Sequence, residues 1–543
     1  MSLLSSEKGD SSNDDEYVES FICNENDVGE NDMKAFDLDG GKVLLVKQKG
    51  KLSAVGNLCS HFGAPLSSGA LGEGRVRCPW HGACFNIETG DIEDFPGQDS
   101  IPCFKVSVEQ GRVKVRAKRS ELQSGKRTKA MINQLEEDER TFVVIGGGPS
   151  GAICAETLRQ EGFTGRVVMI NKEPTLPYDR IMVSKFLNFE LDKKLLRSEQ
   201  FYAENNIETI TGTEVVSLDS TNNELLLNNG NRIKYDKVYI ATGSKARKAS
   251  IEGADLINVC VLRSNEDAKY VHNQLNADKE VVILGVSFIG LEAAAYCVGK
   301  VAKVTVIGRS AVPLMDSFGE QVGERVMKLF KEKGVNFIMN SGIKRCIGDD
   351  NQKLTSVELN DGTVIKTDIC IMGVGSIPCT TLLNESEVNV NKNGSVDTNL
   401  FLETNVQGIY AGGDIANAPV LCNNNERATI GHYGLAQYHG RIAALNMVGK
   451  TTELRTVPFF WTMLFGNGIR YVGYGTPHDI IIEGDLEQLK FVAFYLDAER
   501  KVIGMADCGR SPVVAQFAEY LSQGKVLYEN QLNPDPFAWT KWI

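Results

Sequence analysis

Residues 59–81 read CSHFGAPLSSGALGEGRVRCPWH and contain two short Cys/His pairs. Cys59 and His61 form a C-x-H pair, and after sixteen residues Cys78 and His81 form a C-x-x-H pair. Thiolates and imidazoles are both metal ligands. Because the chain has only six His, two of them beside Cys at similar offsets indicate a metal centre. We expect one pair on each of two loops that approach each other.

The mixture of Cys and His within each pair indicates which centre is bound. A Rieske-type 2Fe–2S cluster has two thiolates on one iron and two imidazoles on the other, so each loop has to supply one of each. A Cys₂His₂ zinc site is the alternative, although zinc fingers do not normally mix Cys and His within a pair. Gly82-Ala-Cys-Phe85 and Phe95-Pro96-Gly97 resemble the rest of a Rieske domain over residues 40–115. We therefore predict the cluster ligands Cys59, His61, Cys78 and His81.

One departure from the Rieske pattern bears on the reduction potential. High-potential Rieske proteins carry an additional Cys in each loop, and these two form a disulfide over the cluster. Ala64 and Trp80 stand at those places here, and Cys84 has no counterpart in the first loop. The chain thus resembles the ferredoxin-like Rieske proteins, which implies a potential toward the lower end of the range of about −150 to +300 mV.

The composition is that of a globular protein, with 42% hydrophobic and 24% charged residues in 543. The net charge of 58 − 70 = −12 argues against nucleic acid as a partner. We expect residues 1–16 to be a disordered acidic leader, which matches neither a secretory signal nor a transit peptide. With no apolar run of 18 residues, we expect no transmembrane segment. The acidic leader favours a cytoplasmic location. Thirteen irregularly spaced Cys fit metal ligands and reduced thiols.

Two strand–turn–helix–strand units lie in the middle of the chain. Strand 142–145 leads into GGGPSG at 146–151 and a helix, and strand 281–284 leads into GVSFIG at 285–290 and a second helix. In a G-x-G-x-x-G turn the backbone can approach a pyrophosphate, which then lies at the helix N-terminus. A turn needed only for packing is the alternative for one such motif alone, whereas two of them predict two dinucleotides.

The first unit is predicted to bind FAD. Glu173 ends its second strand and can bind ribose hydroxyls. The segments 177–185, 240–247 and 404–414 resemble those of the FAD-dependent pyridine-nucleotide reductases, in which the last carries an Asp to the flavin ribityl chain. A plain strand and turn is the alternative for that segment. The expected FAD-binding residues are Gly146, Gly148, Pro149, Ser150, Gly151, Glu173, Arg180, Lys185, Val216, Arg247, Asp414, His432 and Tyr433.

The second unit is predicted to bind NAD(P)H through Gly285, Ser287 and Gly290. Its second strand ends at Arg309, without the Asp or Glu that favours NADH. Arg309 could meet a 2′-phosphate, which slightly favours NADPH, although an Arg at such a strand end is often merely solvated.

Residues 171–200 contain no Cys. Flavoprotein reductases with two redox-active Cys carry C-x₄-C just after the first unit, so thiol–disulfide chemistry is disfavoured. The electrons of the flavin need another acceptor, and the predicted cluster lies in the same chain.

The combination of these parts, with Pro458-Phe-Phe-Trp461 and residues 487–495, resembles the AIF-like flavoproteins. More distantly it is similar to the ferredoxin reductases of aromatic-ring dioxygenases. The resemblance implies that Lys185 and Glu292 pair beside the flavin N5 as the catalytic residues. Some relatives of AIF are mitochondrial, which is the alternative to a cytoplasmic location.

The same resemblance places four residues near the reacting rings. His432 and Tyr433 would lie against the flavin, Trp461 would approach the nicotinamide side, and Gly375 the nicotinamide ribose. A core aromatic at a domain interface is the alternative for Trp461, and a structural His for His432.

We therefore predict a multidomain fold: an all-β Rieske domain, two Rossmann-like α/β domains for FAD and NAD(P), and a C-terminal α+β domain. The expected boundaries are 17–117 for the Rieske domain, 118–140 for a linker (or a partner-docking or nuclear-localisation patch), 141–268 with 393–455 for FAD, 269–392 for NAD(P) and 456–543 for the last domain.

The predicted function is an NAD(P)H-dependent FAD oxidoreductase that passes electrons to its own cluster and on to an unidentified protein or small-molecule acceptor. A Rieske oxygenase is disfavoured because the remaining His form no D/E-x-x-H-x₄-H cluster, and a nitrite reductase because no sirohaem domain is present. A pro-apoptotic or redox-signalling protein with the redox centres as a switch stays as the alternative.

Overall fold

The computed structural model describes residues 16–542, so the predicted acidic leader lies outside the described residues except for Glu16. The chain forms two compact units. The first consists of residues up to 130 together with those from 511 onward, and the second is Met131–Arg510. Within residues 16–542, no helix has both the length and the apolar character needed to cross a membrane.

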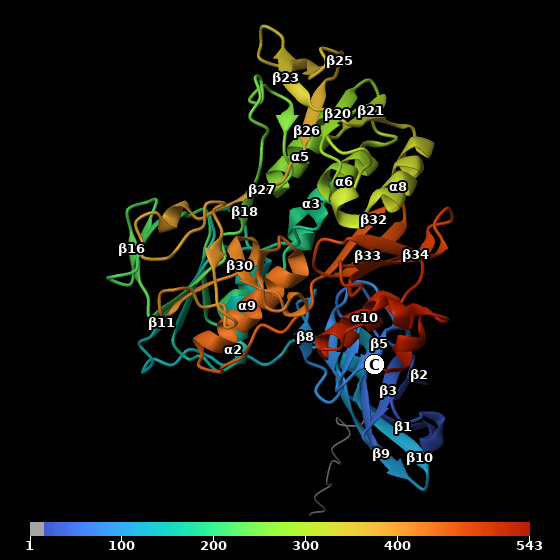
Figure 1. The fold of residues 1–543 in the computed structure, drawn as a ribbon. Coiled ribbons are helices and arrows are strands. Elements are labelled where there is room, and N and C mark those ends of the chain that lie inside the picture. The colour runs from blue at the N-terminus through green and yellow to red at the C-terminus, as the bar shows by residue number, and fades with distance from the viewer. Residues whose placement is uncertain (1–15, 543) are drawn as a thin grey trace, which may run out of the picture. The chain divides into compact units, whose positions relative to one another are not determined.

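The first unit is built on two antiparallel sheets (Figure 1). The six-stranded sheet has the order β1-β10-β9-β4-β3-β2, with strands Tyr17–Asn24, Arg112–Lys118, Cys103–Glu109, Lys51–Gly56, Gly41–Gln48 and Asp32–Leu38. The four-stranded sheet has the order β5-β6-β7-β8, with strands Ala70–Gly72, Arg75–Arg77, Cys84–Asn86 and Ile92–Asp94. The all-β prediction for this region is confirmed, and a short helix, α1 (Arg119–Ser124), follows β10.

Strand β3 separates two apolar cores because its side chains alternate between its faces. Val43 and Leu45 pack into one cluster, whereas Leu44 and Val46 pack into another that also contains the Cys59 side chain. All four apolar side chains of β3 are fully buried. The predicted metal-binding Cys thus belongs to a rigid core next to a central strand.

The C-terminal segment adds a helix to the first unit. Helix α10 (Val513–Ser522) contacts β5 and β6, and Figure 1 shows it in red beside the blue β5. We expected residues 456–543 to form one α+β domain, but the structure divides this range at 510/511. The reason is that α10 packs on the small sheet of the first unit.

The second unit contains two five-stranded parallel sheets, one for each predicted dinucleotide. The first has the order β13-β12-β11-β17-β29, with strands Ile207–Ile210, Arg166–Ile170, Thr141–Ile145, Lys237–Ile240 and Ile409–Ala411. The second has the order β19-β26-β20-β21-β22, with strands Val259–Cys260, Ile369–Met372, Glu280–Leu284, Lys303–Ile307 and Val335–Ile338. Strand β19 precedes the expected boundary at 268/269, yet it pairs with β26, so the second sheet begins earlier than predicted.

Helices follow the turns of both sheets. The main ones are α2 (Pro149–Gln160), α3 (Met182–Lys185), α5 (Asn265–Gln274), α6 (Phe288–Cys297), α8 (Glu320–Glu332) and α9 (Tyr433–Met447). α2 packs against α9 on the first sheet, and Figure 1 shows α6 and α8 beside the second.

The remaining strands of the second unit form smaller sheets and one larger antiparallel sheet. The small ones are β14-β15-β16 (Val215–Asp219, Glu224–Leu227, Arg232–Lys234), β23-β24-β25 (Ile343–Gly348, Leu354–Leu359, Val364–Lys366), β28-β30-β31 (Val396–Asp397, Ala416–Pro419, Arg427–Thr429) and β18-β27 (Ser244–Ala246, Ser376–Pro378). The larger one has the order β32-β33-β36-β35-β34, with strands Phe459–Leu464, Asn467–Gly473, Val502–Cys508, Lys490–Leu496 and Asp479–Asp485.

Candidate functional site

The two predicted cluster loops have the same backbone geometry. In the first, the Cys59 N–H donates to the Ala64 carbonyl (2.9 Å), and the Gly63 N–H donates back to the Cys59 carbonyl (2.8 Å). In the second, Cys78 and Ala83 are joined in the same way (2.7 Å), and Gly82 donates back to Cys78 (3.2 Å). Gly63 and Gly82 both have positive φ, 73° and 81°, which favours glycine. Each loop is therefore a tight turn that directs one Cys inward.

The four predicted ligands meet as two pairs of like atoms. The Cys59 and Cys78 thiols hydrogen-bond to each other, and this bond together with burial raises the pKa of Cys59. The Nδ1 atoms of His61 and His81 are 3.2 Å apart, with ring centroids separated by 4.9 Å. Among residues 16–542, no three His, Cys, Asp or Glu side chains gather around one point as the ligands of a single ion would. Two thiols and two imidazoles paired by type fit the donor set of a Rieske cluster.

Two further segments border the first loop. The Ser60 hydroxyl donates to the Asp99 carbonyl (2.5 Å), which ties the loop to the segment that follows Phe95-Pro96-Gly97. Burial, assisted by the charge of Lys126, lowers the pKa of His61 to about 3, so its imidazole is neutral and can offer a lone pair to a metal. Lys126 lies in the stretch that we expected to be a plain linker.

In both glycine-rich turns, the first and last glycines lie against a backbone carbonyl oxygen at nearly the same distances. A Cβ on Gly146 would lie 2.2 Å from the Ala241 carbonyl oxygen, and a Cβ on Gly151 would lie 1.9 Å from that of Gly146. The corresponding distances are 2.2 Å from Gly285 to the Gly373 oxygen and 2.1 Å from Gly290 to the Gly285 oxygen. The first and last glycines of both motifs are therefore required by packing.

At the middle position of each turn, the backbone conformation does not require glycine. Gly148 has φ −86° and ψ −177°, and Ser287 has φ −90° and ψ −172°, a region open to any residue. A Cβ on Gly148 would have no atom within 4 Å. The N-terminus of α2, which begins at Pro149, thus faces open space where a pyrophosphate would fit.

Glu173 and Arg180, both predicted to bind FAD, form a mutual ion pair. Arg180 Nη2 is 2.6 Å from Glu173 Oε1, and the Tyr178 hydroxyl donates to Glu173 Oε2 (2.9 Å). The Arg180 guanidinium also lies over the Tyr178 ring, 4.7 Å from its centroid. Glu173 was expected to end the second strand, but β12 ends at Ile170, so the ion pair links the loop after β12 to the predicted segment 177–185.

Asp414 lies in a 3₁₀ helix (Gly413–Ile415) directly after β29. Its Oδ2 accepts hydrogen bonds from the Ser244 hydroxyl (2.8 Å) and from Arg263 Nη2 (2.9 Å). The Gly413 N–H donates to His439 Nδ1 (3.1 Å), which holds the turn against α9. These contacts fix the carboxylate at the carboxyl end of the first parallel sheet, where ligands of such sheets bind.

Lys185 and Glu292 form the predicted ion pair, and both side chains are largely buried. Glu292 on α6 also accepts from the Ser184 hydroxyl (2.5 Å) and from the Thr462 hydroxyl on β32 (2.8 Å). Three elements therefore orient one carboxylate, which in turn orients the Lys185 ammonium.

His432 joins an aromatic group at the start of α9. Its ring lies edge-on to Trp461, with centroids 5.3 Å apart, and 5.5 Å from the Phe460 ring. Burial lowers the pKa of His432 to about 4, so the ring is neutral. Tyr433 is the first residue of α9, next to it in the chain.

The other predicted residues lie nearer the surface. The Arg247 N–H donates to the Gly375 carbonyl (2.9 Å), which brings these two together across β18 and β27. Val216 on β14 is 43% exposed, and Arg309 is exposed at the end of β21. Their assignment to FAD and to NAD(P)H stays a prediction.

Several contributors were missed by sequence reasoning. Ser184 and Thr462 support Glu292, and Arg263 and Ser244 support Asp414. Ser184 and Ser244 lie within the segments 177–185 and 240–247, but their roles were not predicted, and Thr462 and Arg263 belong to no motif that was recognised. One visible signal was overlooked: Gly-Ala follows at the same offset, four and five residues after Cys59 and after Cys78.

The comparisons with known proteins define the class to which this arrangement belongs. The chain belongs to the pyridine nucleotide-disulphide oxidoreductase family, which its residues 140–439 match, and residues 19–105 match the Rieske [2Fe-2S] domain. Despite the family's description, no two Cys within residues 16–542 form a disulfide.

Individual proteins and solved structures are similar to this chain over most of its length. The chain is 39% identical to apoptosis-inducing factor 3 of Mus musculus over 95% of this chain and 86% of that protein. It is 32% identical to the rubredoxin-NAD(+) reductase of Pseudomonas putida over 65% of this chain and 92% of that one. Among solved structures, the covalent putidaredoxin reductase–putidaredoxin complex matches with a TM-score of 0.71 and 26% identity, over 75% of this chain and 99% of that one.

These matches confirm the fold class and the cofactor set. The chain is an electron-transfer oxidoreductase with a Rieske 2Fe–2S cluster, FAD and NAD(P)H. They do not test which side chains hold each cofactor, so the residue assignments stay predictions supported by the geometry above.

Proposed function

We propose that this chain oxidises NAD(P)H at its flavin domain and delivers the electrons one at a time, through its own Rieske centre, to a separate acceptor. When bound, FAD and the cluster supply the conversion of a two-electron donor into one-electron steps. The observation that carries the proposal is the pairing of two thiols and of two imidazoles in a chain that also holds two dinucleotide-type turns. With no C-x₄-C pair near the flavin turn, the cluster is the exit for the electrons.

The proposed roles of the flavin-domain residues follow from how each is held. The open space at Gly148 receives the pyrophosphate of FAD, and Asp414, fixed by Ser244 and Arg263, receives the ribityl hydroxyls. Lys185 supplies a positive charge whose place is set by Glu292. This charge tunes the flavin electrostatically and needs no proton transfer.

The nicotinamide side is proposed to involve the second turn. Ser287 is small and extended, so its backbone still permits a pyrophosphate at the N-terminus of α6. Trp461 and Gly375 are proposed to border the nicotinamide and its ribose. Arg309, exposed after β21, is proposed to favour NADPH by meeting the 2′-phosphate.

The acceptor is proposed to be a one-electron carrier. The solved putidaredoxin reductase forms a complex with putidaredoxin, and here the in-chain Rieske domain takes the place of such a separate ferredoxin. Because Ala64 and Trp80 replace the disulfide-forming Cys of high-potential Rieske proteins, a potential in the lower part of the Rieske range is proposed.

Stopped-flow reduction of the purified protein by NADH and by NADPH, followed by EPR of the frozen product, tests the proposal. Flavin bleaching should precede the appearance of a reduced Rieske signal. Cys59→Ser should lose the EPR signal of the cluster and the transfer of electrons to cytochrome c, yet it should retain reduction of the flavin by NAD(P)H. The matched control is Cys103→Ser: Cys103 lies on β9 of the same unit, and its thiol donates to the Glu88 carbonyl between β7 and β8 (2.9 Å). A Rieske signal that survives in Cys59→Ser contradicts the ligand assignment.

A further inference from the structure

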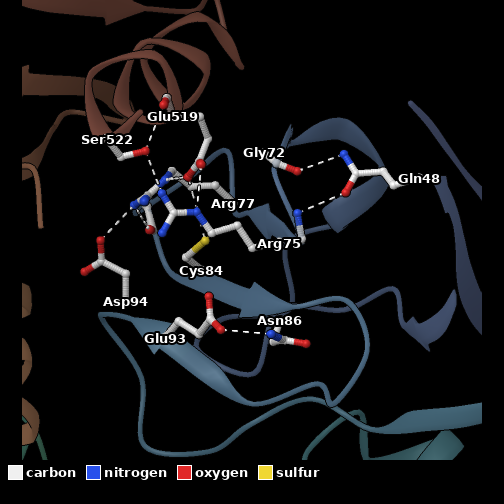
Figure 2. A network of polar contacts seen from close by, with 12 residues as sticks. Gln48, Gly72, Arg75, Arg77, Cys84, Asn86, Glu93, Asp94, Glu519 and Ser522 are labelled. Carbon is white, nitrogen blue, oxygen red and sulfur yellow. Dashed lines mark hydrogen bonds and ion pairs between the residues drawn. The ribbon is translucent and has the colours of Figure 1, made fainter. Parts of the chain in front are cut away.

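Strand β6 directs two arginines at one carboxylate from the far end of the chain. Figure 2 shows Arg75 and Arg77 converging on Glu519 of α10. Arg77 Nε donates to Glu519 Oε1 (2.5 Å), and Arg75 Nε donates to Glu519 Oε2 (2.8 Å). Arg75 Nη2 also donates to the Ser522 hydroxyl (2.6 Å). Both oxygens of the carboxylate are thus used.

The small sheet is shaped to admit this carboxylate. A Cβ on Gly72 would lie 2.2 Å from Glu519 Oε2, so only glycine leaves room at that position. Gln48 holds the turn that follows, because its amide donates to the Gly72 carbonyl (3.0 Å) and accepts from the Gly74 N–H (3.0 Å). The Glu519 side chain is fully buried, and a buried carboxylate is tolerated only when it is paired in this way.

Arg77 continues the network into the second cluster loop. It directly precedes Cys78, and its Nη1 donates to the Gly82 carbonyl (2.8 Å), next to His81. The same Nη1 lies 3.2 Å from Asp94 Oδ2 (Figure 2). One guanidinium therefore clamps both ends of the loop that carries Cys78 and His81.

We infer that Glu519 is a positioning residue for the iron–sulfur centre: through Arg77 it holds the second cluster loop in shape and balances the charge beside it. The inference rests on the proposed ligands Cys78 and His81. It assigns to the C-terminal segment a role in setting the properties of the cluster, although no cluster ligand lies there. Glu519 faces both guanidinium groups, and Asp94 adds a second carboxylate beside Arg77.

The test is a potentiometric titration of the full-length holoprotein, followed by EPR, for the unsubstituted protein and for Glu519→Gln. Loss of the buried negative charge leaves Arg75 and Arg77 under-compensated, which favours the more negative, reduced centre. We expect the potential to shift to more positive values, the g-values to change, and iron to pass to a chelator several-fold faster. Flavin reduction by NAD(P)H should keep its rate.

Glu73→Gln is the matched control. Glu73 follows Gly72 in the β5–β6 turn and pairs with Lys49, but its side chain is 72% exposed, so solvent screens the change. This variant should keep the potential, g-values and iron retention of the unsubstituted protein. An equal shift in Glu73→Gln and Glu519→Gln would overturn the inference.

Gly72→Ala is a second variant, which tests the inference in the case that Glu519→Gln does not fold. It keeps the charge but pushes the carboxylate from its place, so g-values and iron retention should change while flavin reduction does not. Unchanged cluster spectra and potential in a folded Glu519→Gln or in Gly72→Ala overturn the inference. Absence of a Rieske signal from the unsubstituted protein would instead overturn the proposed ligand set, so the two failures are distinguishable.

Discussion

The two cluster loops share one backbone design but are supported in different ways. Both use a Cys-to-Ala hydrogen bond and a left-handed glycine. The first loop is held by a neutral hydrogen bond from Ser60 to the Asp99 carbonyl, which lies 39 residues away in the chain. The second is braced by the charged Arg77, whose partner Glu519 is 442 residues away.

The two contacts differ in how much free energy their loss is expected to cost. A neutral hydrogen bond is worth little more than the water contacts that it replaces. A buried ion pair contributes little net stability when intact, but is costly to break because it leaves an uncompensated charge. The second loop therefore depends on the docking of α10, whereas the first does not.

The largest expected effect comes from breaking the charged brace. Glu519→Ala should lower the free energy of unfolding of the first unit by about 3–5 kcal/mol, because the buried Arg77 and the partly buried Arg75 lose the carboxylate that they share. Denaturant unfolding followed by circular dichroism measures this, with Glu73→Ala as the exposed control. A loss no larger than that of the control would contradict a buried pair.

The next effect tests the shared backbone design. Gly63→Ala should cost about 1–2 kcal/mol of unfolding free energy, because an L-residue is strained at φ 73° even though a Cβ there meets no atom within 4 Å. Gly111→Ala, at φ 75° in the β9–β10 turn and equally unobstructed, should cost the same. Only Gly63→Ala should also reduce iron content, measured by absorbance and iron analysis. Equal iron loss in both would mean that the cluster senses global stability alone.

A smaller loss is expected from the neutral brace of the first loop. Ser60→Ala should cost about 1 kcal/mol, because it removes one hydrogen bond to the Asp99 carbonyl. The measurement is again denaturant unfolding, and Ser124→Ala, at an exposed hydroxyl, serves as control. A cost as large as that of Glu519→Ala would remove the contrast between the loops.

The smallest expected effect is a pH dependence of stability, which the charged contact of the second loop should show and the neutral contact of the first loop should not. Burial raises the pKa of Glu519, but Arg77 and Arg75 outweigh it and hold that pKa below its usual range. A carboxylate of lowered pKa adds stability that is complete above its unfolded-state pKa of about 4.3 and is lost as pH falls through the folded value.

The difference in unfolding free energy between the unsubstituted protein and Glu519→Gln should therefore be constant from about pH 8 to 6 and shrink below about pH 5. The corresponding difference for Ser60→Ala should not change over this range, because Ser60 does not titrate. Unfolding curves at several pH values check both expectations, and a parallel pH dependence of the two variants would contradict the assignment.

Features that depend on neighbouring residues could be predicted. The glycines at 146, 151, 285 and 290 were expected from their spacing, and close backbone approach is the reason for each. The strands around them and the meeting of Cys59 with Cys78 also follow from local patterns. The Lys185–Glu292 pair was expected only through resemblance to a family, since its partners lie far apart in the chain.

Other features needed the folded chain. Residues 456–543 looked like one domain because the alternation of strands and helices ends at their start, yet α10 within that range packs on β5 and β6 of the first unit. The partners of Asp414 and Glu292 come from several elements and have no common spacing.

The chain's local chemistry, in short motifs of Cys, His and Gly, was sufficient to specify an iron–sulfur centre and two dinucleotide sites. Such motifs act over a few residues, where covalent geometry restricts what the backbone can do. The partner of Arg77 was decided by tertiary packing alone, since Glu519 approaches only after α10 has docked and Gly72 has made room. A buried charge has to find its counter-charge wherever the fold brings one, and no spacing along the chain records that meeting.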